Sequence, residues 1–393
     1  MDLKEAALNL HKLNKGKLAT KSKVSVATKQ DLSLVYTPGV AEVCRAIASN
    51  KSSVYEYTMK ANSVAVVTDG SAVLGLGNIG AEASLPVMEG KCVLFKELAN
   101  IDAFPICLKT QNDKEIIEIV KNIEPAFGGI NLEDISAPRC FGIEEALLDI
   151  GIPVMHDDQH GSAIVILAAL MNAAKVVGKK IEDLKVVING AGAAGTAVTK
   201  LLLCLGIDRN ICTSVREIVL CDSKGIIYDG RADLNEFKKQ LAKVTNRSKR
   251  IGTLKDALAG ADAFVGLSAG NLLIADDLRN MNKNSIIFAM ANPIPEIMPD
   301  EAKKFAAVVG TGRSDFPNQI NNSLSFPGVF RGALDAKAVK INNEMKIAAA
   351  HALANCIKPT KDNILPYTLD KSVVPRIAEA VKKAALESGL ARK

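Results

Sequence analysis

Tryptophan is absent from this sequence of 393 residues, and aromatic residues make up only 4% of it. A surface on which nucleic-acid bases stack needs aromatic side chains, so we expect no nucleic-acid partner. The net charge of +6 is a mild excess, and the hydrophobic content of 48% is ordinary for an α/β protein. The densest basic stretch, residues 238–250, indicates either a solvated helix and loop or a site for a cofactor phosphate.

Long hydrophobic runs and paired cysteine motifs are also missing. The longest apolar run, residues 163–171, is well short of the ~20 residues that span a bilayer, and the first residues lack the apolar segment of a signal peptide. The eight cysteines form no C-x-x-C pair, and most lie in apolar runs, which predicts reduced core residues. We therefore expect no membrane partner and a cytoplasmic location.

Strand-like and helix-like segments alternate along the chain. Residues 31–49 predict an extended segment, a Pro-Gly turn and a helix. The further strands are predicted at 63–69, 104–108, 128–134, 152–157, 184–189, 217–222, 262–268, 285–292 and 306–312. The further helices are predicted at 112–123, 141–151, 161–178, 196–206, 337–357 and 370–390. Such alternation predicts an α/β fold with parallel sheets and crossover helices.

The motif G-x-G-x-x-G occurs twice, as GLGNIG at 75–80 and as GAGAAG at 190–195. The second copy follows an apolar strand and opens a helix, and the next strand ends in Asp222, which could accept hydrogen bonds from a ribose diol. We therefore expect a dinucleotide to bind at GAGAAG, with its pyrophosphate at the helix N-terminus. The residues concerned are Gly190, Gly192, Ala193, Ala194, Gly195 and Asp222. The first copy has no acid at a suitable range, which indicates a tight turn near the active site.

These motifs divide the chain into two domains. Residues 1–160 are predicted to form an N-terminal α/β domain for substrate and metal, and residues 161–393 a C-terminal Rossmann-type dinucleotide-binding domain with the C-terminal helices. The boundary is expected to fall in the helix at 161–178.

The segment HDDQH, residues 156–160, places two histidines four residues apart around Asp157 and Asp158. This spacing occurs in zinc proteases, although simple hydrogen-bonding roles for both histidines are the commoner outcome. A second acidic pair, Glu133 and Asp134, also follows a strand-like run, and ligands of open α/β sheets gather at the carboxyl ends of strands. Carboxylates suit Mg²⁺ or Mn²⁺, while helix N-capping by Asp134 and Asp158 is an equal alternative.

Five other polar residues could take part in chemistry. Lys91 begins an apolar run, and a lysine removed from water has a lowered pKa and could act as a base. A surface lysine is the ordinary alternative for Lys91. Tyr36 is a further candidate, and a core tyrosine is its ordinary alternative. Asn292 and the pair Asn321–Asn322 could orient a carboxylate or a nicotinamide, or could simply form turns.

Eight segments between about residues 30 and 335 together resemble malic enzyme of the short-subunit, bacterial type. They are VYTPGVAEVCRAI, VVTDGSAVLGLGNIG, EGKCVLFKELANIDAFPI, INLEDISAPRCFGIE, IPVMHDDQHGSAIV, VVINGAGAAGTAV, ANPIPEI and NNSLSFPGVFRGAL. The resemblance implies oxidative decarboxylation of (S)-malate to pyruvate and CO₂ with reduction of NAD(P)⁺, using Mg²⁺ or Mn²⁺, in a homodimer. Decarboxylation of oxaloacetate is a possible partial reaction.

The resemblance also implies roles for single residues. Lys91 corresponds to the general base, Tyr36 to the general acid and Asp157 to an aspartate that assists proton transfer. Glu133, Asp134 and Asp158 correspond to the metal ligands, and Asn292 and Asn322 to residues that contact substrate and cofactor. We expect residues 36, 91, 133, 134, 157 and 158 to meet in one cleft that faces the nicotinamide.

Two points of specificity stay open. Large-subunit relatives have an arginine that binds a substrate carboxylate where this chain has Ala72, so the group that binds the C1 carboxylate is not identified. Asp222 favours NAD by repelling a 2′-phosphate, whereas Ser223 and Lys224 could bind one, which leaves NAD slightly ahead of NADP. A metal-free dehydrogenase and an inactive nucleotide-sensing protein are the rival interpretations.

Overall fold

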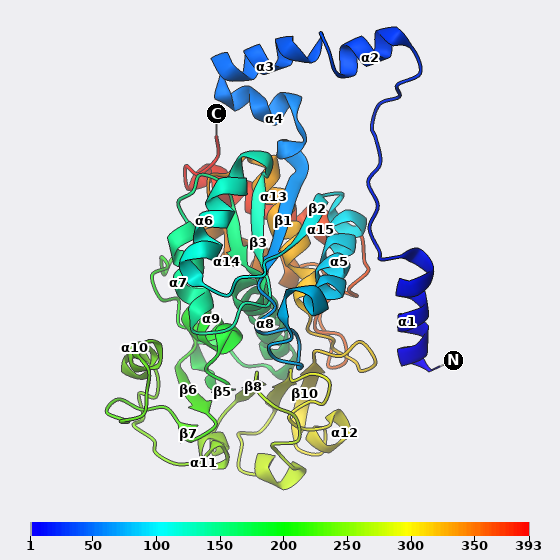
Figure 1. Ribbon diagram of the computed structural model, residues 1–393. Coiled ribbons are helices and arrows are strands. Elements are labelled where there is room, and N and C mark those ends of the chain that lie inside the picture. The colour runs from blue at the N-terminus through cyan, green and yellow to red at the C-terminus, as the bar shows by residue number, and fades with distance from the viewer. Residues whose placement is uncertain (1, 393) are drawn as a thin grey trace.

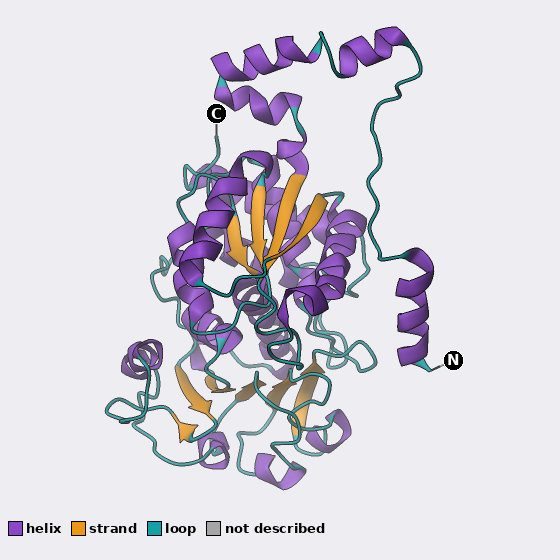
Figure 2. Ribbon diagram, in the orientation of Figure 1, coloured by secondary structure: helices purple, strands orange, loops and turns teal. Residues whose placement is uncertain are grey.

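The first of two β-sheets belongs to the N-terminal half of the chain in this computed structural model, which describes residues 2–392 (Figures 1 and 2). Its strands are β1 (Ser63–Thr68), β2 (Asp102–Cys107), β3 (Gly129–Leu132) and β4 (Val154–His156). All pairings are parallel, in the order β2-β1-β3-β4. The four predicted strands are confirmed, and their carboxyl ends lie along one edge.

The second sheet holds the remaining strands. They are β5 (Lys185–Asn189), β6 (Glu217–Asp222), β7 (Gly225–Ile226), β8 (Ala263–Gly266), β9 (Ser285–Ala289) and β10 (Ala306–Thr311). The order is β10-β9-β8-β5-β6-β7, and only the two-residue β7 runs antiparallel. The chain order reverses at β5, which creates the crevice where doubly wound sheets bind their ligands. The predicted two-domain α/β fold is confirmed.

Helices cover both sheets and join them. The α-helices of this part are α5 (Gly80–Ala99), α6 (Asp113–Ile123), α7 (Arg139–Leu147), α8 (Asp157–Val177), α9 (Ala193–Leu202), α10 (Glu236–Val244), α11 (Leu254–Leu258), α12 (Pro299–Ala302), α13 (Phe326–Asp335), α14 (Asn343–Ala354) and α15 (Val373–Glu387). Short 3₁₀ turns lie at η1 (Lys51–Ser53), η2 (Met59–Asn62), η3 (Glu124–Ala126), η4 (Ile181–Asp183), η5 (Ala275–Leu278) and η6 (Asn322–Leu324).

Helix α8 links the two sheets through the middle of the molecule (Figure 1). It is the one helix among residues 2–392 that is long and apolar enough to cross a membrane, but most of its side chains are buried inside the protein. A helix that is apolar on all sides is expected in the centre of a large core. The expected domain boundary, after residue 160, lies inside helix α8. The division of the chain at this residue stays a prediction.

The C-terminal helices contact the first sheet's layer as well as the second. Phe95 of α5 packs against Phe326 and Phe330 of α13, with ring centroids 4.7 and 5.4 Å apart and edge-to-face geometry. Such pairs add about 0.5–1.5 kcal/mol to the burial of the rings. The C-terminal segment therefore helps to hold the two halves together.

The N-terminal arm, residues 2–57, contrasts with this compact body. It contains α1 (Leu3–Asn14), α2 (Lys29–Val35), α3 (Val40–Ser49) and α4 (Val54–Tyr57), and none of these helices has a buried residue. The predicted extended segment at 31–36 is wrong, because Thr28 and Asp31 form a capping box that starts α2 there. The predicted helix after the Pro-Gly turn is confirmed as α3.

The cysteines are not all reduced. Cys204 and Cys212 form a disulfide, whereas the other six are free. The loop after α9 turns the chain back on itself, and the two Cα atoms come within 5.9 Å, inside the range that a disulfide bridges. The prediction of reduced core cysteines is therefore wrong for this pair.

Candidate functional site

The two acidic pairs meet at the carboxyl ends of β3 and β4. The strands pair in register, with Leu132 opposite His156, so the residues that follow each strand lie side by side. Ligand oxygens of Glu133, Asp134 and Asp158 all lie within 4.8 Å of one another. The backbone N–H of Asp134 donates to the Asp158 carboxylate at 2.8 Å. The parallel sheet thus brings together residues that are far apart in the sequence.

The composition of this cluster fits a hard divalent cation. All three ligand groups are carboxylates, which suit Mg²⁺ or Mn²⁺ better than zinc. One Asp134 oxygen is buried with no hydrogen-bond partner among the described residues. Burial, together with Asp158 and Glu133, raises the pKa of Asp134 to about 8, and burial also raises the pKa of Glu133. A bound cation would relieve this repulsion.

The alternative that Asp134 and Asp158 cap helices is wrong. The N-cap of α7 is Pro138 and that of α8 is His156, and neither helix end has a side-chain cap. Asp158 is instead in the first turn of α8, with one carboxylate oxygen accepting from the Asp134 backbone N–H.

Lys91 of α5 is buried against this cluster. Its Nζ lies 2.5 Å from Asp157 and 2.9 Å from Glu133, and 4.2 Å from the centre of the Phe326 ring. Burial alone would lower the pKa of Lys91, but the two carboxylates outweigh burial and raise it. The predicted lowering of this pKa is therefore wrong. Burial raises the pKa of Asp157 to about 6, although the ion pair with Lys91 opposes this rise.

The predicted asparagines lie in different surroundings. Asn322 joins the cluster, since its Nδ2 donates to Asp157 at 2.7 Å. Asn292 instead contacts GLGNIG through its backbone, because a Cβ on Gly75 would lie 2.7 Å from the Asn292 carbonyl oxygen. Val73 and Gly77 pair across this segment, so the interpretation of GLGNIG as a tight turn is confirmed.

Tyr36 is not brought to the cluster within one chain. It ends α2, its side chain is 66% exposed, and it makes no side-chain hydrogen bond to residues 2–392. In Figure 1, α2 and α3 lie beyond the amino-terminal ends of the first sheet's strands, whereas the cluster lies at their carboxyl ends. One chain therefore assembles only five of the six residues expected in the cleft.

Glu144 of α7, which the sequence did not single out, holds the HDDQH segment. Its carboxylate accepts from the His156 backbone N–H at 2.8 Å and from Gln159 at 3.2 Å, and pairs with His160 Nε2 at 2.9 Å. Burial alone would raise the pKa of Glu144, but its pairing with His160 and the charge of Lys346 lower it to about 2. His160 is thus a hydrogen-bonded support, whereas His156 Nδ1 lies 3.8 Å from the Asp158 carboxylate, beyond hydrogen-bond distance. Both ring nitrogens of His156 lack a hydrogen-bond partner among the described residues.

A cavity of about 520 Å³ opens onto the cluster. Its wall includes Lys91, the three clustered carboxylates, Asn322 and Ala72. His11 and Lys17 of the arm also line it, and the Lys-rich N-terminal sequence gave no signal of this. The volume is in the range of small-molecule sites.

A second cavity, of about 840 Å³, lies at the crevice of the second sheet and is lined by Gly190 and Gly192. A Cβ on Gly195 would lie 1.7 Å from the Gly190 carbonyl oxygen, so only glycine allows α9 to start this close to β5. No atom lies within 4 Å of a Cβ built on Gly192, which leaves the backbone open to a ligand. With the free amides of Ala193, Ala194 and Gly195 in the first turn of α9, the site fits a pyrophosphate.

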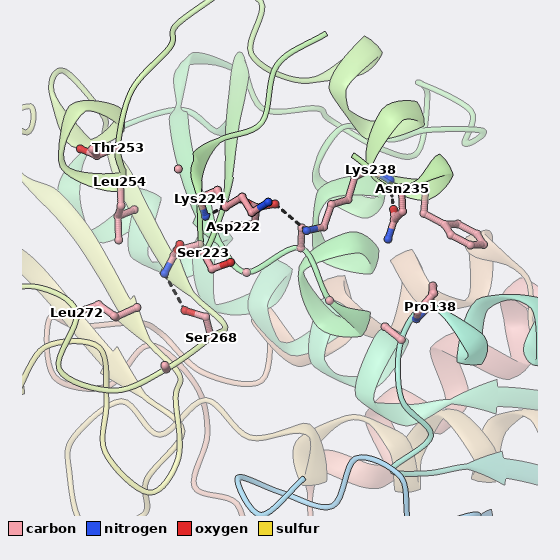
Figure 3. A pocket seen from close by; sticks show the side chains of 18 of the residues that line it. Pro138, Asp222, Ser223, Lys224, Asn235, Lys238, Thr253, Leu254, Ser268 and Leu272 are labelled. Atoms are coloured by element: carbon pink, nitrogen blue, oxygen red, sulfur yellow. Dashed lines mark hydrogen bonds and ion pairs between the residues drawn. The ribbon is translucent and has the colours of Figure 1, made fainter. Parts of the chain in front are cut away.

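Asp222 ends β6 beside this cavity, as expected, but two cations already hold it. Arg231 lies 2.5 Å and Lys238 2.7 Å from the same carboxylate oxygen. Burial alone would raise the pKa of Asp222, but these two hydrogen bonds lower it to about 2. Figure 3 shows Asp222, Ser223 and Lys224 between Asn235 and Lys238 on one side and Leu254 and Leu272 on the other.

Comparison with known proteins gives a consistent result. Residues 159–386 match the family model described as malic enzyme, NAD binding domain, and residues 14–116 match malic enzyme, N-terminal domain. The chain is 57% identical to the bifunctional malic/malolactic enzyme of Bacillus subtilis, over 100% of this chain and 95% of that protein. It is 46% identical to the NADP-dependent malic enzyme of Haemophilus influenzae, over 99% of this chain but only 53% of that longer protein.

A solved structure agrees with the whole fold. The NAD-dependent malic enzyme of Thermotoga maritima superposes with a TM-score of 0.92 at 47% sequence identity. The superposition covers 97% of this chain and 99% of that one.

Proposed function

Since the chain belongs to the malic enzyme family, we propose that it oxidatively decarboxylates (S)-malate to pyruvate and CO₂ while reducing NAD(P)⁺. The observation that carries this proposal is the position of the Lys91–Asp157 pair directly beside the Glu133, Asp134 and Asp158 carboxylates. A proton-transfer pair next to a cation site suits a substrate with a hydroxyl group flanked by carboxylates.

Glu133, Asp134 and Asp158 would hold the Mg²⁺ or Mn²⁺ ion. A cation held there would supply Lewis-acid polarisation of the oxygen at C2 of the substrate. Lys91 donates to that oxygen and accepts its proton as it passes a proton to Asp157, whose pKa of about 6 lets it serve as the acceptor. Asn322 keeps Asp157 in place. Decarboxylation of added oxaloacetate would use the same residues.

Tyr36 would protonate C3 after CO₂ is lost, and we propose that it does so in the site of a second copy. The chain is then a homodimer in which the Tyr36 segment of each arm reaches the other copy, while His11 and Lys17 stay at the cavity of their own chain. Two observations support this: Tyr36 lies away from its own cluster, and the arm exposes many apolar side chains that another surface would cover. They include Leu3, Leu8, Leu10, Leu13, Val24, Val26, Leu32 and Leu34.

The surroundings of Asp222 favour use of both cofactors. A free carboxylate would repel the 2′-phosphate of NADP, but Arg231 and Lys238 offset its charge, and Lys224 and Lys255 line the same cavity. We therefore propose that NADP⁺ is accepted beside NAD⁺. We also propose that the protein is located in the cytoplasm.

The test follows formation of reduced cofactor with malate and Mn²⁺, with and without EDTA. Activity that depends on the cation is expected, and Asp158→Ala should raise the half-saturating Mn²⁺ concentration at least about 10-fold because one ligand is lost. Asp149→Ala, at an exposed aspartate, is the matched control. Activity that resists EDTA would favour a metal-free dehydrogenase, and no activity would favour a nucleotide-sensing protein.

A further inference from the structure

The substrate cavity is short of positive charge. Four carboxylates gather at its base, and Lys91 with one divalent cation leaves one of their formal charges uncompensated before malate, itself a dianion, binds. Ala72 lines the cavity and supplies no cation. Tight binding of malate therefore requires a further basic residue in the wall of the cavity.

Lys17 is placed at this cavity by a docked turn of the arm. Its backbone N–H donates to Glu89 at 3.0 Å, and its Nζ donates to the Pro86 carbonyl at 2.7 Å, both on α5. The preceding Gly16 has φ +103°, and a Cβ there would lie 2.7 Å from the Glu89 carboxylate. Only glycine fits this turn without strain, so the sequence Gly16–Lys17 is adapted to the docking.

The ammonium of Lys17 lies over Gly90 of α5, in the wall of the cavity that Lys91 also lines, and is not neutralised. A Cβ built on Gly90 would lie 3.2 Å from Lys17 Nζ, so the ammonium covers the residue that precedes Lys91. Within residues 2–392, no carboxylate lies within 4.0 Å of this Nζ, and Pro86 takes only one of its three donors. Lys91, by contrast, lies between two carboxylates.

We propose that Lys17 binds the C1 carboxylate of malate. It supplies the positive charge that large-subunit relatives have in an arginine where this chain has Ala72. This inference rests on the proposed function. The C1 carboxylate stays charged from malate to pyruvate, so an ion pair there persists through the reaction. A cation on the C4 carboxylate would instead stabilise the charge that must be lost as CO₂. Lys17 therefore contributes equally to binding of substrate and transition state, and its loss affects KM rather than kcat.

The experiment compares Lys17→Gln with the wild-type enzyme. KM for malate should rise roughly 10- to 100-fold, as for the loss of a hydrogen-bonded ion pair, while kcat and the KM for the cofactor change by less than about 2-fold. The inhibition constant of pyruvate, which keeps only the C1 carboxylate, should rise by a similar factor. Lys17→Arg should retain most of the affinity. Lys21→Gln, at an exposed lysine of the same arm, should change none of these values.

Each other outcome overturns a defined part of the proposal. A raised KM for malate with unchanged pyruvate inhibition would move Lys17 to the C4 carboxylate. A fall in kcat and melting temperature without a KM change would make Lys17 a residue that only docks the arm. Unchanged constants in an active enzyme would remove Lys17 from the site, whereas a wild-type enzyme inactive on malate would refute the proposed function itself.

Discussion

The arm, residues 2–57, and the body, residues 58–392, differ in where their apolar side chains lie. Phe95, Phe326 and Phe330 of the body are completely buried, whereas Leu3 and Leu13 of the arm are each 83% exposed. Burial of apolar surface contributes about 25 cal/mol per Å², and isolated helices shorter than ~12–15 residues are marginal in water. Helices α1 and α2, of 12 and 7 residues, bury nothing. The body is thus stable through its own core, and the arm depends on what covers it.

The same contrast applies to the proposed chemistry. The body assembles Lys91, Asp157 and the three clustered carboxylates without outside help. The arm has one docked turn, at Lys17, and carries Tyr36 on a segment that does not dock on its own body. A catalytic residue on a segment that needs a partner makes activity depend on assembly.

The largest expected effect is on turnover. Lys91→Ala in the body and Tyr36→Phe in the arm should each lower kcat about 10²- to 10⁴-fold, as expected for loss of acid–base catalysis. Steady-state rates with malate and Mn²⁺ measure this. Near-normal turnover of either variant would remove that residue from the mechanism.

Mixed dimers of these two variants test the difference between arm and body directly. If Tyr36 serves the other copy, a purified heterodimer has one site with both groups intact and should recover about half of the wild-type activity. If each arm serves its own body, both sites stay defective and the heterodimer is as inactive as its parents. The two homodimers are the controls.

The sequence predicted the body far better than the arm. Strands such as β1 and β5 are apolar runs bounded by turn residues, and their pattern reflects burial that the body itself provides. Helix α2 was missed although Thr28-x-x-Asp31 is a capping signature, because its exposed side chains show no core-facing pattern. The Cys204–Cys212 bond was missed because it depends on how a loop turns, which spacing does not determine.

A third prediction compares the stability of the two regions. Phe330→Ala should lower the free energy of unfolding by about 3–5 kcal/mol, because it leaves a cavity in the core of the body. Leu34→Ala, at an exposed position of α2, should have a smaller effect that grows with protein concentration, since it weakens only the contact between copies. Urea unfolding at two protein concentrations measures both. An effect of Leu34→Ala that is the same at both concentrations would contradict the dependence of the arm on a partner.

The sequence itself predicted the part of the site that strand ends determine, and the resemblance added Lys91 and Asn322, which the structure brings to the cluster. Glu133 and Asp158 follow adjacent parallel strands, so their convergence follows from the predicted sheet. The direction of the Lys91 pKa shift was missed because the sequence indicated burial but not the two carboxylates that pair with it. Glu144 and Lys17 were missed because each acts on residues from another element, and no local pattern reports such contacts.

The smallest expected effect concerns Glu144, a carboxylate of the body that holds the HDDQH segment through its contacts with His156 and His160. Its pKa of about 2 in the folded protein lies below the ~4.3 of an unfolded glutamate. A lowered folded pKa gives stability that is fully present above the unfolded value and is lost as pH falls from about 4 towards 2, in total on the order of 2–3 kcal/mol. Glu144→Gln should therefore be less stable than wild type at pH 7 and lose less stability on acidification, so that the two converge near pH 2–3. Thermal unfolding between pH 2 and 7 measures this, with Glu145→Gln, an exposed neighbour on α7, as the control. Parallel curves for wild type and Glu144→Gln would show that the Glu144 charge does not support the HDDQH turn, and that the body positions Asp158, the proposed metal ligand, without it.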